Sequence, residues 1–132
     1  GAFGGQAYFD AHGKERHAVA LESDFGADRI WRVDFGLPDS AKPLADRIAA
    51  ALAPLGVTRG RDRAGGGADI GALVAAGVPA IDLQQDGTRY FDWHHTPDDT
   101  LDKVDPVQLR QNVAVWTATV ASLAESSDTE LP

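Results

Sequence analysis

Two short segments contain the side chains that could carry chemistry. In the first, Glu22-Ser23-Asp24 follows the apolar run 18–21, which has the length and composition of a buried strand. Because alternate side chains of a strand point the same way, Glu22 and Asp24 could act together on a cation such as zinc. The alternative is structural, with Asp24 capping a turn beside Gly26 and Glu22 in solvent.

The second segment is FDWHHTPDDT at residues 91–100, which places adjacent histidines before a turn. Adjacent residues cannot both face one metal from a regular strand, so at most one of His94 and His95 is expected to be a ligand. Thr96 is a candidate N-cap, and Asp99 follows it at the third position, as in a capping box. Two interpretations stay open: a metal loop held rigid by its caps, or a capped turn with half-exposed histidines.

Other polar motifs give weaker signals. The run Gly65-Gly66-Gly67 before a helix could form an anion-binding nest, but its spacing is not that of a phosphate-binding loop. A loop that lets the backbone approach a site is the preferred interpretation. Ser23 lacks the small-residue elbow of a serine hydrolase, and the chain has no cysteine. A metal-assisted hydrolase is therefore favoured over one that forms a covalent intermediate.

The elements that must position these groups alternate along the chain. The pattern predicts helices over 6–15, 39–53, 70–76 and from Pro106 onward, and strands over 18–21, 27–36 and 78–83. This alternation is typical of the α/β class, here a three-layer α/β/α sandwich with a mostly parallel or mixed sheet. Functional groups of such sheets gather beyond the carboxyl ends of the strands, where both polar segments fall.

Local signals set the ends of the helices. Asp69 is the expected N-cap of the short helix 70–76, and Asp105 with Gln108 is expected to open the last helix as a capping box. The last helix is predicted to bury a stripe at helical spacing. That stripe consists of Leu109, Val113, Trp116, Val120 and Leu123. We expect residues 1–132 to form a single domain with a frayed tail over 125–132.

Composition excludes several classes of function. The net charge of −8 argues against a nucleic-acid binder, because little here could neutralise phosphates. No apolar run approaches the length needed to span a membrane. Without cysteine, neither disulfides nor thiolate metal ligands are available.

Three motifs together are far more specific than any one of them. They are GGQAY with ALESDFG, GGGADI with GVP, and QDGTRYFDWHHTPDDTLDKVD. With these motifs the chain resembles the co-catalytic zinc exopeptidases of the carboxypeptidase Q (plasma glutamate carboxypeptidase) type, which are relatives of the bacterial zinc aminopeptidases. The resemblance covers nearly the whole chain, from about Gly4 to Leu123.

The resemblance implies an activity and a cofactor. It implies an aminopeptidase, carboxypeptidase or dipeptidase that hydrolyses short peptides next to a free terminus, with water activated on two zinc ions. By position, Asp24 of ESDFG matches the aspartate ligand that does not bridge the metals, and His95 matches the last histidine ligand. Asp69 matches an acid that caps a helix beside the substrate pocket, and Asp99 an acid behind the ligands.

Neighbouring positions match the entrance of the pocket in this family. They are Arg89, Tyr90 and Phe91. Trp93 departs mildly from the pattern, because relatives commonly have tyrosine there. His94 has no ligand counterpart in the resemblance.

The resemblance also places part of the catalytic machinery outside these residues. In relatives the first histidine, the bridging aspartate and the paired glutamates lie upstream of GGQAY, so the general base is expected before Gly1. The chain is then the C-terminal half of a peptidase domain and inactive alone. The alternative is a non-catalytic fragment or interaction module. Uncovered apolar surface would favour a homodimer, and because relatives are often exported, an extracytoplasmic location (periplasmic or secreted) is expected.

Overall fold

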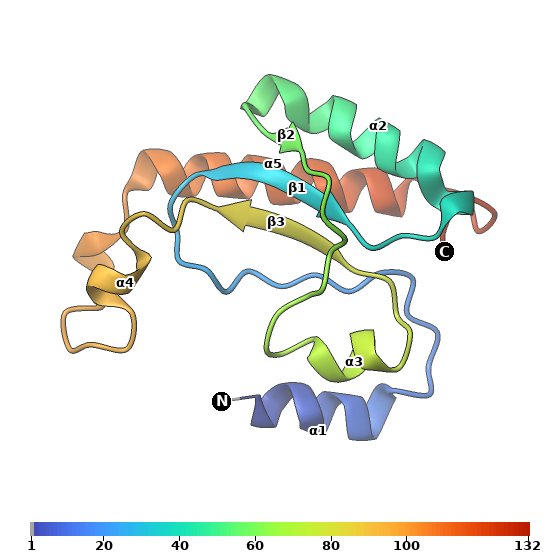
Figure 1. The fold of residues 1–132 in the computed structure, drawn as a ribbon, viewed down its shortest axis with the longest axis horizontal. Coiled ribbons are helices and arrows are strands. Elements are labelled where there is room, and N and C mark those ends of the chain that lie inside the picture. The colour runs from blue at the N-terminus through green and yellow to red at the C-terminus, as the bar shows by residue number, and fades with distance from the viewer. Residues whose placement is uncertain (1) are drawn as a thin grey trace.

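A mixed sheet of three strands lies at the centre of the computed structural model, which describes residues 2–132. The strands are β1 (Ile30–Phe35), β2 (Thr58–Arg59) and β3 (Ile81–Gln85), in the order β2-β1-β3. β2 runs parallel to β1, whereas β3 runs antiparallel to it (Figure 1). The chain is therefore of the α/β class with a mixed sheet, as the sequence predicts.

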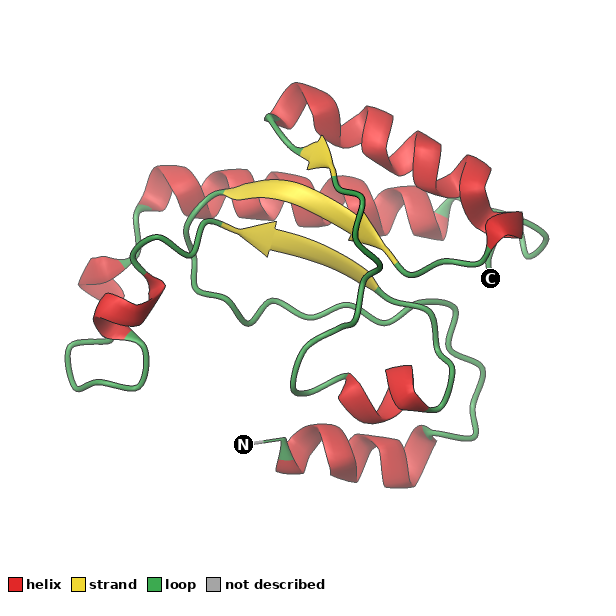
Figure 2. Cartoon of the chain, in the orientation of Figure 1, coloured by secondary structure: helices red, strands yellow, loops and turns green. Residues whose placement is uncertain are grey.

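Helices flank this sheet in two groups. They are α1 (Phe3–His12), α2 (Lys42–Leu52), α3 (Gly71–Ala75), α4 (Tyr90–Trp93) and α5 (Pro106–Ala124). α2 and α5 pack together over one face, while α1 and α3 lie beside each other on the far side of the segment before β1 (Figures 1 and 2). No helix within residues 2–132 is long and apolar enough to cross a membrane.

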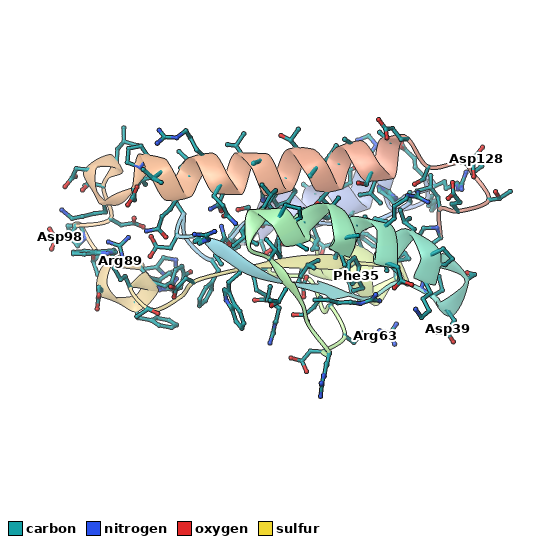
Figure 3. The ribbon with its side chains drawn as sticks, turned by 90° about the horizontal axis from the view of Figure 1, so that it is seen from above. Phe35, Asp39, Arg63, Arg89, Asp98 and Asp128 are labelled. Atoms are coloured by element: carbon teal, nitrogen blue, oxygen red, sulfur yellow. The ribbon has the colours of Figure 1, made fainter. Side chains whose placement is uncertain are left out.

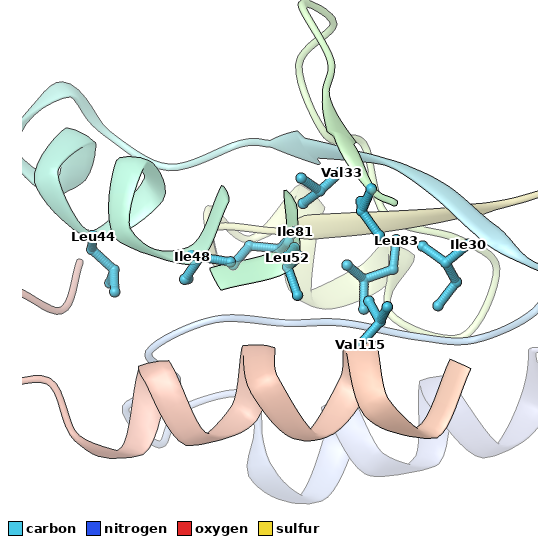
Figure 4. Close-up of a cluster of buried hydrophobic side chains, with 9 residues drawn as sticks. Ile30, Val33, Leu44, Ile48, Leu52, Ile81, Leu83 and Val115 are labelled. Atoms are coloured by element: carbon cyan, nitrogen blue, oxygen red, sulfur yellow. The ribbon is translucent and has the colours of Figure 1, made fainter. Parts of the chain in front are cut away.

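One apolar cluster joins the sheet to α2 and α5. Ile48 and Leu52 of α2 and Val115 of α5 are fully buried against strand residues (Figure 4). The strands contribute Ile30, Val33, Ile81 and Leu83. Burying one such aliphatic side chain stabilises a fold by about 1.5–3 kcal/mol, so this cluster fixes the orientation of α5 on the sheet.

The predicted stripe of α5 is wrong for most of its length. Leu109, Val113 and Val120 are 42%, 59% and 50% exposed. The helix buries Asn112, Val115 and Thr119 instead. Trp116 and Leu123 of the predicted stripe still pack against the apolar cluster, so the buried face is rotated toward Asn112 rather than opposite to the prediction. Asn112 contributes to this face because its side chain satisfies backbone groups of the adjoining loop.

The predicted strand over 18–21 is reduced to one bridge. Ala20 pairs in parallel with Ala80: its N–H donates to the Pro79 carbonyl and its own carbonyl accepts from the Ile81 N–H. Beyond Ala20, the Glu22 side chain is hydrogen-bonded to the start of α3, and the Ser23 side chain to that of Gln85 at the end of β3.

Helix α5 begins where the sequence predicts. Asp105 Oδ1 accepts from the N–H groups of Val107 at 2.7 Å and Gln108 at 3.4 Å, and these bonds lower the pKa of Asp105. Gln108 does not complete a capping box, however. Its Oε1 accepts from the Arg29 N–H at 2.8 Å, so this side chain secures the loop before β1.

The end of the chain contacts α2. Arg47 of α2 forms an ion pair with Glu130 at 2.6 Å, and Glu130 also accepts from the Ser127 N–H. The Ser127 N–H and the Arg47 guanidinium lower the pKa of Glu130 to about 2. Leu131 packs against the main apolar cluster.

A buried carboxyl lies on the other face of the sheet. Asp34 of β1 is 2% exposed, faces Asp82 of β3 across the strand pair, and forms an ion pair with Arg32 at 2.9 Å. Its Oδ1 is buried without a hydrogen-bond partner. Burial raises the pKa of Asp34 above the ordinary 3.8, and the charge of Arg32 offsets this only in part.

We expect Asp34→Asn to stabilise the protein at neutral pH. Because the folded-state pKa lies above the unfolded-state value, Asp34 loses its stabilising contribution as pH rises through 3.8 toward the raised pKa. Urea unfolding of both proteins between pH 3 and 7 should show a small difference at pH 3 that grows in favour of the variant. A difference that grows in favour of the wild type would mean that the Arg32 ion pair outweighs burial.

Candidate metal and substrate site

Two buried carboxamide side chains, those of Gln85 and Asn112, anchor the loop that carries Asp24. Gln85, at the end of β3, is 5% exposed, and its Nε2 lies within hydrogen-bonding distance of Ser23 Oγ at 3.1 Å and the Gly26 carbonyl at 2.7 Å. Asn112 of α5 supports Gln85 through its Oδ1 at 3.1 Å. Asp24 is therefore exposed on a loop whose neighbours on both sides are anchored.

Further side chains of α5 continue this anchoring toward β1. Asn112 Nδ2 donates to the Asp28 carbonyl at 2.9 Å, and Gln111 both accepts from the Ile30 N–H and donates to the Ile30 carbonyl. The sequence interpretation missed these groups because it counted apolar side chains on α5. The signal was present: Gln108, Gln111 and Asn112 are carboxamides at helical spacing.

The histidine segment forms a tight turn at the end of α4. Thr96 donates through Oγ1 to the Trp93 carbonyl at 2.7 Å and accepts from the Asp98 N–H at 3.3 Å. His95 adopts a left-handed backbone with φ of 57°, which costs a residue other than glycine about 1–3 kcal/mol. The turn predicted from Thr96 is confirmed, and it presents His95 to solvent.

An aromatic chain connects this turn to the Asp24 loop. Phe25, next to Asp24, stacks on Tyr90 with ring centroids 4.0 Å apart. Tyr90 lies 4.6 Å from the His94 ring, and His94 stacks on His95 at 3.7 Å. The fold thus brings together two segments that are about 70 residues apart in sequence.

Carboxylates surround this aromatic chain. Burial raises the pKa of Tyr90, and the negative charges of Asp24 and Asp99 raise it further. The phenol therefore stays protonated at neutral pH and able to donate a hydrogen bond. Asp99 lines one cavity with Tyr90, and Asp24 is adjacent to Phe25, which stacks on Tyr90, so an electronegative region extends from the Asp24 loop to the histidine turn.

Of the residues predicted at the pocket entrance, Arg89 is already paired with an acid of the protein, whereas Phe91 is exposed to solvent. Arg89 Nε donates to Asp28 at 3.0 Å, and its Nη2 donates to the second oxygen of the same carboxylate. A substrate carboxylate would have to displace Asp28 to bind this guanidinium. Phe91 is 74% exposed and contacts Tyr90 and His94 edge to face. Arg89 and Asp98 both lie at the end of the molecule opposite Asp39 and Asp128 (Figure 3).

A small cavity of about 80 Å³ lies behind the aromatic chain. It is lined by Phe25, Tyr90, Trp93 and Asp99 among others. The Trp93 indole N–H is buried near it without a hydrogen-bond partner. Within residues 2–132 no hydrogen bond joins Asp99 to either histidine, so an orienting role of Asp99 stays a prediction.

Asp69 does not cap α3, which corrects the sequence prediction. Its own N–H and that of Ile70 donate to Glu22 Oε2, each at 2.9 Å, and the Asp69 carboxylate is not used as a cap. The N–H groups of Gly65 and Gly66 donate to Asp82. The N–H groups of Gly65 and Gly66 are therefore not free to form a nest for a substrate anion, because Asp82 already accepts from both.

The side chains at this site are of the types that bind zinc, but they are too few to form a complete zinc site. Zinc accepts carboxylate oxygen and imidazole nitrogen, and four ligands are usual. Over residues 2–132 no group of three or more histidine, aspartate or glutamate side chains is placed to hold a metal ion. Asp24 and His95 could each supply one ligand to a larger site.

Comparisons with known proteins agree with these features. The family model of peptidase family M28 matches residues 1–120. Carboxypeptidase Q of Mus musculus is 32% identical over the whole chain, and that of Homo sapiens is 30% identical. The chain spans 28% of the length of each of these relatives.

A solved structure shares both fold and sequence. The crystal structure of a peptidase M28 precursor from Shewanella amazonensis SB2B superimposes on the whole chain with a TM-score of 0.89 at 45% identity, and the chain covers 30% of it. The match extends over the Asp24 loop, the glycine loop and the histidine turn alike, because it leaves no part of the chain out. Fold, motif order and family match coincide, and the chain belongs to peptidase family M28.

Proposed function

We propose that this chain is part of a zinc-dependent exopeptidase that hydrolyses short peptides next to a free terminus, and that Asp24 and His95 each bind one of two zinc ions. The observation that carries the proposal is the aromatic contact of Phe25 with Tyr90, which ties the Asp24 loop to the histidine turn. Family membership supports the reaction class, and the identity of the two donors supports the metal.

In the proposed reaction, the residues of this chain hold the metal ligands in place and orient them. Zinc, when bound, supplies a Lewis acid that polarises the scissile carbonyl and lowers the pKa of a water molecule. Gln85 and Asn112 keep the Asp24 loop fixed, and the Thr96 turn keeps His95 in place. The proton acceptor is a glutamate that we place outside this chain.

Aromatic side chains provide the substrate wall in this proposal. Phe25, Tyr90 and Phe91 form one contiguous aromatic surface beside the electronegative region. Such a surface binds an apolar or aromatic side chain of a peptide, while nearby carboxylates attract a free amino group. Asp69 and Arg89 lie on the adjoining loops and would act on the shape of the pocket rather than on the reacting atoms.

Zinc content and turnover test this proposal. We expect the 132-residue chain alone to retain no stoichiometric zinc after dialysis and to show no turnover of dipeptide substrates. The longest open reading frame that contains these residues should bind about two zinc ions and turn over the same substrates. Zinc binding and turnover by the chain alone would refute the proposal that residues outside this chain complete the site. Absence of both from the longer protein would refute the peptidase proposal.

A non-catalytic association module is the second candidate function of the isolated chain. The exposed apolar side chains of Leu109, Val113 and Val120 on α5 favour it, because an apolar helix face in water tends to be covered. Sedimentation of the isolated chain should reveal a homodimer, and a monomer at all concentrations would exclude it.

An extracytoplasmic location is proposed from the resemblance and can be tested by cell fractionation.

A further inference from the structure

The carboxylate of Glu22 joins two segments that lie 47 residues apart. Glu22 Oε2 accepts from the N–H groups of Asp69 and Ile70, both at 2.9 Å. These donors belong to the loop that enters α3, and they have no partner within that helix. Bonds from N–H groups to a charged acceptor are roughly twice as strong as those between neutral groups.

The glycine loop is shaped to fit this carboxylate. A Cβ atom at Gly67 would lie 1.6 Å from Glu22 Oε1, so only glycine allows the approach. Glu22 Oε1 is buried and has no hydrogen-bond partner. Gly66 has a φ of 72°, which a side chain would strain. The carboxylate therefore occupies a position that the backbone leaves open for it.

Asp82 secures the same loop at its other end. Its two carboxylate oxygens accept from the N–H groups of Gly65 at 2.9 Å and Gly66 at 3.1 Å. The loop is thus fixed at both ends by acids from two other segments. Glu22 is the one of these acids that belongs to the loop of Asp24.

Glu22, Asp24, Gly66 and Gly67 line one cavity of about 170 Å³. The glycine loop is one wall of this cavity and the Asp24 loop is another. Glu22 fixes the separation of the two walls, because it belongs to one and is hydrogen-bonded to the other. This arrangement would hold whether or not a metal is bound.

We infer that Glu22 is a positioning residue, which holds the glycine loop at a set distance from Asp24 and so fixes the width of this cavity. Phe25 of the proposed substrate wall also lines the cavity, which makes it the substrate cleft in this proposal. We call the two hydrogen bonds from the Asp69 and Ile70 N–H groups to Glu22 the clamp. The role of the clamp in catalysis rests on the proposed function, whereas the clamp itself rests on the contacts alone. Glu22 acts through the loop, and no contact with the reacting atoms is required of it.

Amide hydrogen exchange in the longest protein that contains this chain tests the clamp without reference to activity. Glu22→Gln keeps the shape and an acceptor but loses the charge, so we expect the Asp69 and Ile70 amides to exchange roughly tenfold faster. Glu22→Ala removes the acceptor, and the increase should reach roughly a hundredfold. Amides of Val33 and Leu83 in the sheet should be unchanged. Glu125→Gln removes the same charge at an exposed site and serves as the control.

Steady-state kinetics of the same variants test the consequence. A wider cleft should raise KM roughly tenfold in Glu22→Gln with kcat within about twofold, as expected for lost substrate binding. Unchanged exchange at Asp69 and Ile70 would overturn the clamp, as would uniformly faster exchange across the sheet. A fall in kcat at constant KM would mean that Glu22 acts on the reacting atoms. A wild-type protein without peptidase activity but with the exchange pattern would refute the proposed function and leave the clamp supported.

Discussion

Alanine in place of Asp24 or His95 is expected to lower kcat/KM for peptide hydrolysis by at least about a thousandfold in the longest protein that contains this chain. Each substitution removes one proposed zinc ligand, and metal stabilisation of the transition state is worth several kcal/mol, at about 1.4 kcal/mol per factor of ten. Zinc content measured on the same preparations should fall below that of the wild type. The two losses should occur together, because the activity depends on the bound metal.

Two other histidines provide controls for this experiment. His94→Ala should retain zinc, because its ring is stacked between Tyr90 and His95 and has no ligand counterpart in the resemblance. His12→Ala changes an exposed residue of α1 whose ring is paired with Glu15, and it should leave both zinc content and activity unchanged. Near-wild-type turnover in the Asp24 or His95 variant would contradict the ligand assignment.

Gln85→Leu is expected to lower the free energy of unfolding by about 3 kcal/mol. The substitution removes the two hydrogens that Nε2 shares among the Gly26 carbonyl, Ser23 Oγ and Asn112 Oδ1. The buried Asn112 Oδ1 and the partly buried Gly26 carbonyl then lose their donor, which costs about 1–3 kcal/mol for each group. Because these bonds flank Asp24, the variant should also bind zinc more weakly. Chemical denaturation followed by circular dichroism measures the first effect, and zinc titration measures the second.

Gln84→Leu is the matched control for Gln85→Leu. Gln84 is the adjacent residue of β3, so its side chain lies on the opposite face of the sheet, and it is only partly buried. The same chemical change there should cost less than about 1 kcal/mol. Equal losses in the two variants would show that the buried carboxamide network does not hold the Asp24 loop.

Local signals in the sequence correctly predicted where α5 begins and where α3 ends. Asp105 and Pro106 begin α5 as expected, and Gly77 ends α3 with a φ of 98°, because capping depends on a few adjacent residues. The α/β class with a mixed sheet followed from the alternation of helical and strand patterns. The Thr96 turn was predicted for the same reason, since its bonds join residues at most three positions apart.

Tertiary contacts explain what the sequence did not reveal. The face of α5 that meets the sheet depends on which loop needs its carboxamides, and that loop is about 80 residues away. Glu22 caps α3 in place of Asp69 for a similar reason, because the partner lies in another segment. The 18–21 segment forms one bridge, Ala20 to Ala80, and the side chains that follow it bond to α3 and to the end of β3. Periodicity cannot report any of these contacts.

Anomalous diffraction at the zinc edge from crystals of the longest protein that contains this chain tests the central proposal most directly. We expect two zinc ions, with a carboxylate oxygen of Asp24 about 2.0–2.2 Å from one and an imidazole nitrogen of His95 about 2.0–2.1 Å from the other. Zinc bound elsewhere, or bound without either side chain, would contradict the proposed site.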